Sequence, residues 1–364
     1  MLAAMATSRL LRRMNAQRVL DVLRADGPLR VTELVSVTGL SRPTVDGAAD
    51  ELVRLGWRSE AAAAEGARGR PARSLAFRAD AGHVVGVDIG EYKVRCAVAD
   101  LRGRVVAERV REFGGEERLP VIRHEVAAVV DGVGDLLFAC VGCTGAMNTA
   151  RGTVLFSSVF PDDFDLAGAF ALPCPVIIEN DCNLAVIAER WCGAAAGLDD
   201  VVCVLAGERI GAGIMVGGQL MRGHEGAAGE LSFLGAFEQE HGARGIAQLV
   251  RELSGASPES VFVAAGAGDQ EALAIVERAE RWAGHGIVTT AQIVNPEVVV
   301  IGGGVARAGE ILLAPLRARL ERMVRHPPRL AASPLAERGP LVGALRLALD
   351  ELEPQLLDGL AEAA

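Results

Sequence analysis

The chain has 364 residues, more than one hydrophobic core usually serves, so two or three folding units are expected. Half of the residues are hydrophobic and 23% are charged, which excludes a chain that is disordered throughout. The formal net charge of −10 is unevenly distributed: residues 1–80 hold 13 Arg against 9 Asp and Glu, or +4, which leaves −14 for the rest. A polyanionic partner is therefore expected to meet the N-terminal segment.

Cysteines are spread through the chain without a metal or redox motif. Their number is odd, and no spacing repeats. The pair Cys140 and Cys143 is formally a CxxC motif, but neither a second pair nor a His cluster accompanies it. We therefore expect buried thiols in preference to metal binding or redox chemistry. The seven positions are Cys96, Cys140, Cys143, Cys174, Cys182, Cys192 and Cys203.

Hydropathy gives no sign of a membrane segment. No uninterrupted apolar run reaches the roughly 18 residues of a membrane-spanning helix, and residues 1–13 lack a long apolar stretch. We expect a cytoplasmic protein without membrane contact.

The first 60 residues have the pattern of short helices. One helix is expected from Asn15 to Asp26, and a second from Thr32 to Gly39. Ser41 can cap a third, with Pro43 in its first turn. Two short helices joined by a glycine turn form a helix-turn-helix, which reads bases with the start of its second helix. The residues expected there are Ser41, Arg42, Thr44 and Asp46.

Residues 57–78 change character and predict a β-hairpin wing with a basic tip. The tip carries Arg68, Arg70 and Arg73, and no acidic residue occurs from Ala67 to Ala79. Such arginines are expected to follow phosphates or to enter a narrow minor groove. The alternative is a solvated linker, but the position after a helix-turn-helix favours the wing.

From His83 onward, predicted strands and helices alternate. Two α/β lobes with polar motifs at strand ends would place a cleft between them. We therefore expect a DNA-binding domain over residues 1–80 and a two-lobed domain over residues 81–364. The expected elements are strands at 84–90, 93–100, 138–145, 175–179, 200–206, 212–216 and 297–301, helices at 119–137, 181–195 and between 244 and 292, and terminal helices.

Four motifs, in order, carry a resemblance to a known family. They are Gly86-Val-Asp88-Ile-Gly90-Glu-Tyr-Lys93, Glu179-Asn-Asp-Cys-Asn183, Gly223-His-Glu-Gly-Ala-Ala-Gly-Glu230, and Asn295-Pro296 with the glycines 302–304. With the helix-turn-helix in front, the chain resembles the transcriptional-regulator branch of the ROK family (repressors, open reading frames, kinases) from about residue 14 to 350. The resemblance implies an α/β fold: a winged helix-turn-helix followed by a two-lobed actin/hexokinase-like (ASKHA) domain.

Both loops that resemble the phosphate loops of the family's kinases depart from the kinase pattern. Glu91 and Tyr92 replace a Gly and a Thr in the first loop, and Glu208 and Arg209 replace a Thr and a Gly in the second. A carboxylate close to a phosphate costs on the order of 4 kcal/mol at an effective dielectric constant of about 20. Arg209 could neutralise Glu208, but it would not restore the lost space. We expect no ATP binding, no cofactor and no catalytic residue, and we interpret the glycines 302–304 as a tight strand-to-helix turn.

Three residues match sugar-binding positions of the family. The resemblance implies that Asn180, Asp181 and Glu230 hold a polyol; in the kinases, the residue that Asp181 matches is the general base. Carboxylates accept hydrogen bonds from hydroxyls, and an amide both donates and accepts. Asn180 and Asp181 also open a predicted helix, so capping alone is the alternative explanation of that pair.

The family's zinc segment has lost its ligands in this chain. Residues 239–248 keep its glycines but contain none of its three thiolates, and His241 alone cannot form a tetrahedral site. We expect no metal. Phe233 replaces a sugar- and zinc-binding His, and Gln248 replaces a sugar-binding Glu, so an unusual effector, or none, is expected.

Together these features predict a DNA-binding repressor whose degenerate kinase-like domain senses a sugar or a sugar-derived effector. Relatives form dimers or higher assemblies, so a homodimer or homotetramer on a palindromic operator is expected. Two alternatives remain open at this point. One is an active sugar kinase with an accessory head, and the other is a ligand-independent regulator whose body is only a dimerisation scaffold.

Overall fold

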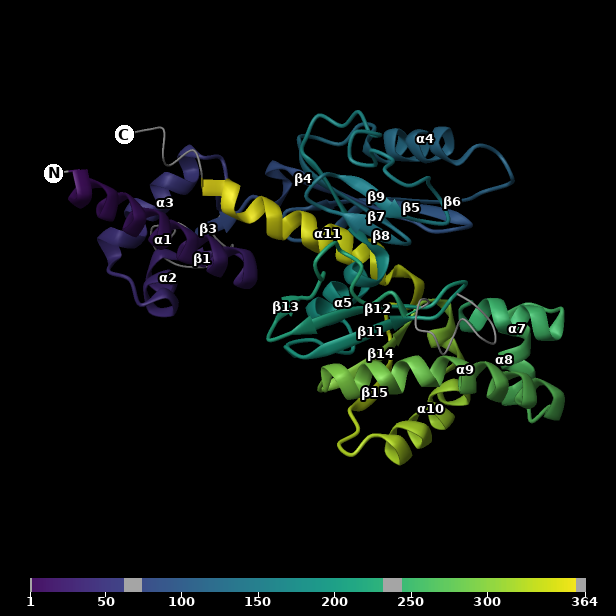
Figure 1. The fold of residues 1–364 in the computed structure, drawn as a ribbon. Coiled ribbons are helices and arrows are strands. Elements are labelled where there is room, and N and C mark those ends of the chain that lie inside the picture. The colour runs from purple at the N-terminus through teal and green to yellow at the C-terminus, as the bar shows by residue number, and fades with distance from the viewer. Residues whose placement is uncertain (1, 62–73, 232–243, 358–364) are drawn as a thin grey trace.

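The computed structural model describes residues 2–61, 74–231 and 244–357 of the chain. It consists of an N-terminal head and a body of two lobes, with the helix α11 (Gly339–Leu352) running from the body toward the head (Figure 1). Among the described residues, no helix is both long and apolar enough to cross a bilayer.

The head contains the expected helix-turn-helix and the base of a wing. The first helix begins earlier than Asn15. The second helix ends before Gly39, which adopts the left-handed conformation, and the third begins after Ser41, both as predicted. A three-stranded antiparallel sheet of order β1-β3-β2 supports the helices. Its elements are α1 (Leu2–Asp26), β1 (Leu29–Arg30), α2 (Val31–Thr38), α3 (Arg42–Arg54), β2 (Arg58–Ala61) and β3 (Ser74–Phe77).

The first lobe is a mixed five-stranded sheet of order β10-β7-β4-β5-β6. Strands β10, β7 and β4 are parallel, so their carboxyl ends meet at one edge. α4 (Arg118–Val130) covers β5 and β6, and a short hairpin, β8 (Ala146–Asn148) and β9 (Thr153–Phe156), follows β7. The strands are β4 (His83–Ile89), β5 (Lys93–Asp100), β6 (Val105–Glu112), β7 (Leu136–Cys143) and β10 (Val176–Asn180).

The second lobe repeats this plan with a sheet of order β13-β12-β11-β14-β15. The helices α7, α9 and α10 form one apolar core with this sheet, and α5 (Asp181–Cys192) contacts β11 and β12. The remaining elements are β11 (Val201–Leu205), β12 (Gly211–Val216), β13 (Gln219–Leu220), α7 (Ile246–Ser254), α8 (Pro258–Gly266), α9 (Gln270–Val294), β14 (Val298–Gly302), α10 (Glu310–Met323) and β15 (Arg329–Ala332).

Two helices, α5 and α11, cross at very close range in the middle of the body. A Cβ atom at Gly343 of α11 would collide with the carbonyl group of Leu184 of α5, so only glycine allows this approach. α5 begins at Asp181, and α11 continues into a 3₁₀ turn, η5 (Glu353–Leu357), beside the head.

The head is fastened to the body through η5. The indole Nε1 of Trp57 donates to the carbonyl oxygen of Leu356 at 2.7 Å, and Gln17 donates to the carboxylate of Glu353 at 3.2 Å. Arg24 lies 3.4 Å from the same carboxylate. Apolar residues of the head, α11 and the first lobe also form one continuous buried cluster. The orientation of the head is therefore tied to the position of α11.

Some predicted boundaries were wrong. The helix expected over 119–137 ends at Val130, because Gly132 in the left-handed conformation turns the chain into β7. Strands β1, β6, β8, β9, β13 and β15 were not predicted. The thiols are all unpaired, and Cys140 and Cys143 are buried as expected, whereas Cys192 is exposed.

Candidate functional site

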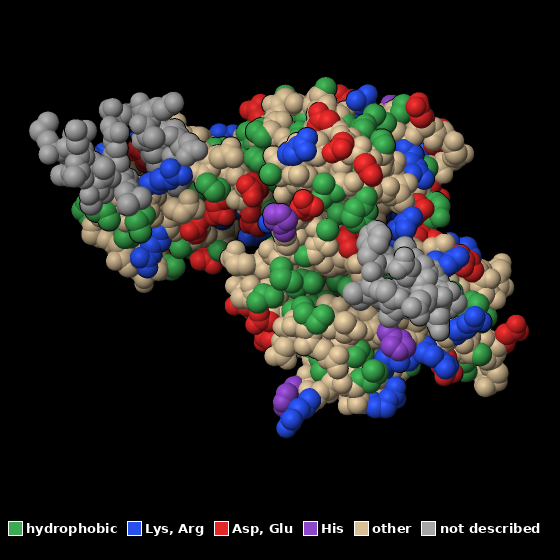
Figure 2. Space-filling model, in the orientation of Figure 1, with side chains coloured by type: hydrophobic (Ala, Val, Ile, Leu, Met, Phe, Trp, Pro, Cys, Tyr) green, Lys and Arg blue, Asp and Glu red, His purple; other side chains and the backbone are tan. Residues whose placement is uncertain are grey.

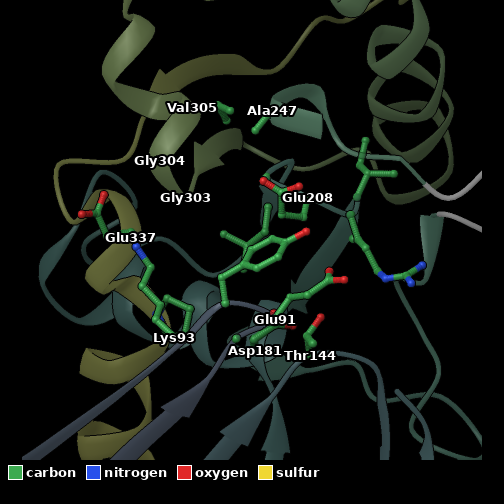
Figure 3. Close-up of a pocket in the computed structure, with 18 of the residues that line it drawn as sticks. Glu91, Lys93, Thr144, Asp181, Glu208, Ala247, Gly303, Gly304, Val305 and Glu337 are labelled. Carbon is green, nitrogen blue, oxygen red and sulfur yellow. The ribbon is translucent and has the colours of Figure 1, made fainter. Parts of the chain in front are cut away.

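A cavity of about 810 Å³ is lined by residues of both lobes and contains the three predicted ligand residues, Asn180, Asp181 and Glu230. In Figure 3, Asp181 and Thr144 lie at one end of the cavity, Ala247 and Val305 lie at the other, and Glu91 and Glu208 lie between them. We refer to these as the Asp181 end and the Val305 end. The cavity exceeds what a single sugar ring would fill.

Asn180 both caps a helix and lines the cavity. Its Oδ1 accepts a hydrogen bond from the backbone N–H of Asn183 at 3.0 Å, which caps α5. Its Nδ2 donates to the carbonyl oxygen of Gly145 at 2.7 Å and to Oδ1 of Asp181 at 3.2 Å. The capping interpretation of this residue is therefore correct, and its amide also holds Asp181 in place.

Asp181 faces a cluster of carboxyl groups. Its Oδ1 accepts from its neighbour's backbone N–H, that of Cys182, at 2.9 Å. Burial, followed by the charges of Asp88 and Glu230, raises the pKa of Asp181 to about 7. A carboxyl group with a pKa near neutrality can accept or release a proton at physiological pH.

Glu230 enters the cavity from a loop that is fixed to the second lobe. Gly229 adopts a φ of 87°, and its carbonyl oxygen accepts from the backbone N–H of Ala212 at 2.8 Å. A side chain at Gly229 would collide with the Ala212 carbonyl group, so the glycine allows this docking. Burial raises the pKa of Glu230 to about 7, although Arg209 acts in the opposite direction.

Behind these residues lies Glu179, a buried carboxylate that connects the two lobes. One oxygen accepts from Nδ2 of Asn183 at 2.9 Å and from the backbone N–H of Asn180 at 2.9 Å. The other accepts from Nε of Arg222, in the second lobe, at 2.7 Å. Glu179 thus links the loop that carries Glu230 to the strand end that carries Asn180.

Asp88, at the end of β4, forms an ion pair inside the cavity wall. Nη1 of Arg95 donates to Oδ2 of Asp88 at 3.3 Å, and both side chains are less than a tenth exposed. Burial raises the pKa of Asp88 to about 6 despite this partner. Sequence reasoning did not identify Arg95, because β5 shows only an apolar pattern around it.

Glu208 is neutralised by a residue that the sequence did not indicate. Nη1 and Nη2 of Arg251 donate to its two carboxylate oxygens at 2.8 and 2.6 Å. Arg209, which the sequence offered as a possible partner of Glu208, lies near Glu230. Gly303 and Gly304 form the expected turn between β14 and a 3₁₀ helix, and they also line the cavity.

The start of α3 is open to solvent. Oγ of Ser41 accepts from the backbone N–H of Thr44 at 3.4 Å and lies 2.8 Å from its hydroxyl, so these two residues cap the helix together. Arg42 and Asp46 are exposed and lie 3.9 Å apart as an i, i+4 pair. Arg68, Arg70 and Arg73 lie outside the described residues. Figure 2 shows basic side chains on the visible surface of the head.

No group of metal-ligating side chains occurs within the described ranges. Phe233 and His241 lie outside these ranges. Gln248 is described; it does not line the cavity, and its amide donates to Glu252 at 3.0 Å.

Comparison with known families assigns both parts of the chain. Residues 84–351 match the model of the ROK family, and residues 14–57 match the IclR helix-turn-helix domain. The chain belongs to the ROK family. An N-terminal helix-turn-helix on a ROK domain is the architecture of a DNA-binding transcriptional regulator, and this chain has it.

Relatives of both kinds, regulators and kinases, are found. The xylose repressor of Caldicellulosiruptor bescii is 24% identical over 86% of this ROK chain and 88% of its own length. A solved ROK family transcriptional regulator, described as a homologue of the E. coli MLC protein, superimposes with a TM-score of 0.76 over 97% of this chain and all of its own, at 21% identity. A ROK glucokinase from Streptomyces griseus, solved with glucose and AMPPNP, gives 0.65 over 74% of this chain and all of its own, at 27% identity.

Proposed function

We propose that this ROK protein is a cytoplasmic repressor that binds a sugar-like effector between its lobes and operator DNA with its head. The observation that carries the proposal is the convergence of Asn180, Asp181 and Glu230 on one cavity from the two lobes. Two carboxyl groups and an amide suit the hydroxyl groups of a polyol. The similarity to a xylose repressor supports a sugar as effector.

Ligand binding at this cavity would favour the closed arrangement of the lobes. Asp181 begins α5, α5 crosses α11 at Gly343, and α11 leads to η5 under the head. A change in the angle between the lobes would therefore move η5, the turn to which the head is attached. In a dimer it would change the half-site spacing that two heads can span, which fits an expected palindromic operator and a homodimer or homotetramer.

Effector and operator binding must be coupled reciprocally. Coupling between sites is usually about 1–3 kcal/mol, or roughly 5- to 150-fold in affinity, and it has the same size in both directions. We therefore expect a cognate sugar to weaken operator binding, and operator DNA to weaken sugar binding by the same factor.

The test combines calorimetry of a sugar panel with operator-binding assays on the wild type and Asp181→Ala. We expect Asp181→Ala to lose the sugar response but to bind the operator like the apo wild type, because the residue lies far from α3. A sugar that binds the wild type and the variant equally well would place the effector elsewhere. Failure of every sugar to bind would favour a body that serves only as a dimerisation scaffold.

One observation favours a sugar kinase as the second candidate. The pKa of about 7 at Asp181 suits a general base that takes a proton from a sugar hydroxyl. Against this function stand the side chains of Glu91, Tyr92 and Glu208, which line the cavity between its two ends. We propose that they exclude a nucleoside triphosphate, and that the cleft binds sugar without catalysis.

A further inference from the structure

The Val305 end of the cavity lies opposite Asp181 and carries apolar side chains (Figure 3). The loops at 88–93 and 207–213 of this chain resemble the loops that bind the nucleotide phosphates in the family's kinases. In this chain, apolar side chains of α7, α8 and the 3₁₀ helix Gly304–Ala308 line that end: Ala247, Pro258, Phe262, Val263, Val305 and Ala308. Such a wall inside a cleft suits an apolar group of a small ligand.

Two large side chains of the cavity are unusually exposed. Val263, at the Val305 end, is 74% exposed, and Tyr92, next to Glu91 in the sequence, is 53% exposed. Large apolar side chains gathered in a concave site gain free energy when a ligand covers them, at roughly 25 cal/mol per Å² of apolar surface. The apolar surface at this end thus provides affinity for an uncharged group.

Acidic side chains outnumber basic ones in the lining of the cavity, and the basic ones lie beside carboxylates. Arg95 pairs with Asp88, Arg251 with Glu208 and Arg307 with Glu337. Lys93 lies beside Glu337 in Figure 3, and Arg209 lies near Glu230. Each basic side chain that lines the cavity therefore already has an acidic neighbour, and a phosphate group would have to displace a carboxylate.

We infer that the effector is an uncharged glycoside with an apolar or aromatic aglycone, whose sugar ring lies at the Asp181 end and whose aglycone lies at the Val305 end. This inference rests on the proposed sugar-sensing function. It adds the prediction that the sugar alone is a weaker ligand than its glycoside, and that a sugar phosphate is weaker still.

The inference is tested by calorimetry with matched pairs of probes. The probes are the methyl and 4-nitrophenyl glycosides of glucose, xylose, galactose, mannose and N-acetylglucosamine, together with glucose 6-phosphate. For the sugar that binds, we expect the aryl glycoside to bind on the order of tenfold more tightly than the methyl glycoside, as burial of a ring predicts. We expect the sugar phosphate to bind more weakly than either.

Substitutions at the Val305 end of the cavity test whether the aglycone binds there. Val263→Asp and Ala247→Leu are expected to remove the advantage of the aryl glycoside and to leave the affinity for the methyl glycoside unchanged. Val216→Asp is the matched control: Val216 is 46% exposed on β12 and does not line the cavity, so it should retain the advantage.

Each other outcome overturns the inference in a recognisable way. Equal affinities of the methyl and aryl glycosides for the wild type would refute the aglycone site while retaining a sugar sensor. Tighter binding of the sugar phosphate would refute the charge argument. Loss of both glycosides in Val263→Asp would show that this end also holds the sugar ring, and it would refute a separate aglycone site. Binding of no probe would refute both the inference and the proposed function.

Discussion

Arg222 in the second lobe donates a hydrogen bond through Nε to Oε2 of Glu179 in the first lobe at 2.7 Å. Glu179 is 1% exposed, so its carboxylate depends on its protein partners. The contact lies directly behind Asn180 and Asp181. It joins the two lobes at the point where the proposed ligand would bridge them.

We predict that Arg222→Ala destabilises the protein by about 1–3 kcal/mol, because a buried carboxylate loses a charged donor. Urea denaturation measures this loss. Arg190→Ala is the control, since Arg190 pairs with Asp199 at an exposed site and its loss should cost less. The double variant Arg222→Ala/Glu179→Gln should recover part of the loss, because the amide needs no counter-charge. A single variant as stable as wild type would show that the inter-lobe pair contributes nothing.

The pH dependence of stability should reveal the carboxyl cluster. Burial raises the pKa of Asp181 and Glu230 to about 7, from 3.8 and 4.5. Between about pH 4 and pH 7 the folded protein therefore binds more protons than the unfolded chain. These two groups make stability fall as pH rises through this range, and their effect levels off above about pH 7.

We therefore predict that Asp181→Asn/Glu230→Gln gains stability relative to the wild type at pH 8 and loses this advantage at pH 5. The difference in the free energy of unfolding between variant and wild type isolates these groups from the other carboxylates. Denaturant titrations at several pH values give this difference. A difference that does not change from pH 5 to pH 8 would contradict the raised pKa values.

Two glycines in helices are predicted to respond in opposite ways to alanine. Gly343→Ala forces α11 away from Leu184 of α5 and should cost at least about 1–3 kcal/mol, the usual cost of overpacking. Gly47 lies inside α3 with open space around it, so Gly47→Ala should stabilise the protein by about 0.5–1 kcal/mol. Thermal denaturation of both variants checks the pair. Equal responses would show that the crossing of α5 and α11 is not tightly packed.

Variants of the head should distinguish the contacts that read bases from the contacts that bind phosphates. Arg42 is exposed at the start of α3, and we predict that Arg42→Ala costs about 1–3 kcal/mol on its preferred operator and much less on unrelated DNA. Replacing Arg68, Arg70 and Arg73 by Ala should weaken both kinds of binding and reduce the salt slope by up to about 0.9 for each phosphate that an arginine had neutralised. Fluorescence anisotropy at several salt concentrations measures both effects. If the triple variant keeps its affinity and slope, the tip is a linker and not a wing.

The protein should not phosphorylate sugars with ATP. Glu91, Tyr92 and Glu208 line the cavity, and we propose that they exclude a triphosphate. We expect a coupled assay with glucose, mannose and N-acetylglucosamine to show no turnover above background. Turnover above about 1 s⁻¹, the lower edge of typical enzyme rates, would establish the kinase instead. The variant Glu208→Thr tests the role of this carboxylate, because it removes the negative charge and the ion pair with Arg251.

The sequence predicted those strands that are buried on both faces. β4, β11 and β14 are nearly continuous apolar runs, which is the pattern of strands buried on both faces. Their positions could therefore be predicted from the sequence alone. β6 could not, because this edge strand is mostly exposed and mixes charged residues with Val105, Val106 and Val110. Its strand character comes from pairing with β5, which local sequence does not encode.

The same distinction holds for the cavity. Asn180, Asp181 and Glu230 stand in short motifs, and the structure brings them to one cavity. The partners that set their chemistry are distant in sequence: Arg222 lies 43 residues from Glu179, and Arg251 lies 43 residues from Glu208. No local pattern marks such pairs. Adjacency in sequence suggested Arg209 as a possible partner of Glu208, whereas in the structure Arg251 pairs with it.

The attachment of the head to η5 has a consequence for the synthesis of the chain. Gln17 and its partner Glu353 are 336 residues apart, and Trp57 is 299 residues from Leu356. Because synthesis adds about 5–20 residues per second, the head is complete roughly 15–70 s before Glu353 and Leu356 are added to the chain. During that time the helix-turn-helix lacks the contacts that orient it. We therefore expect the final orientation of the head to form only in finished chains, and a prematurely terminated copy to lack it.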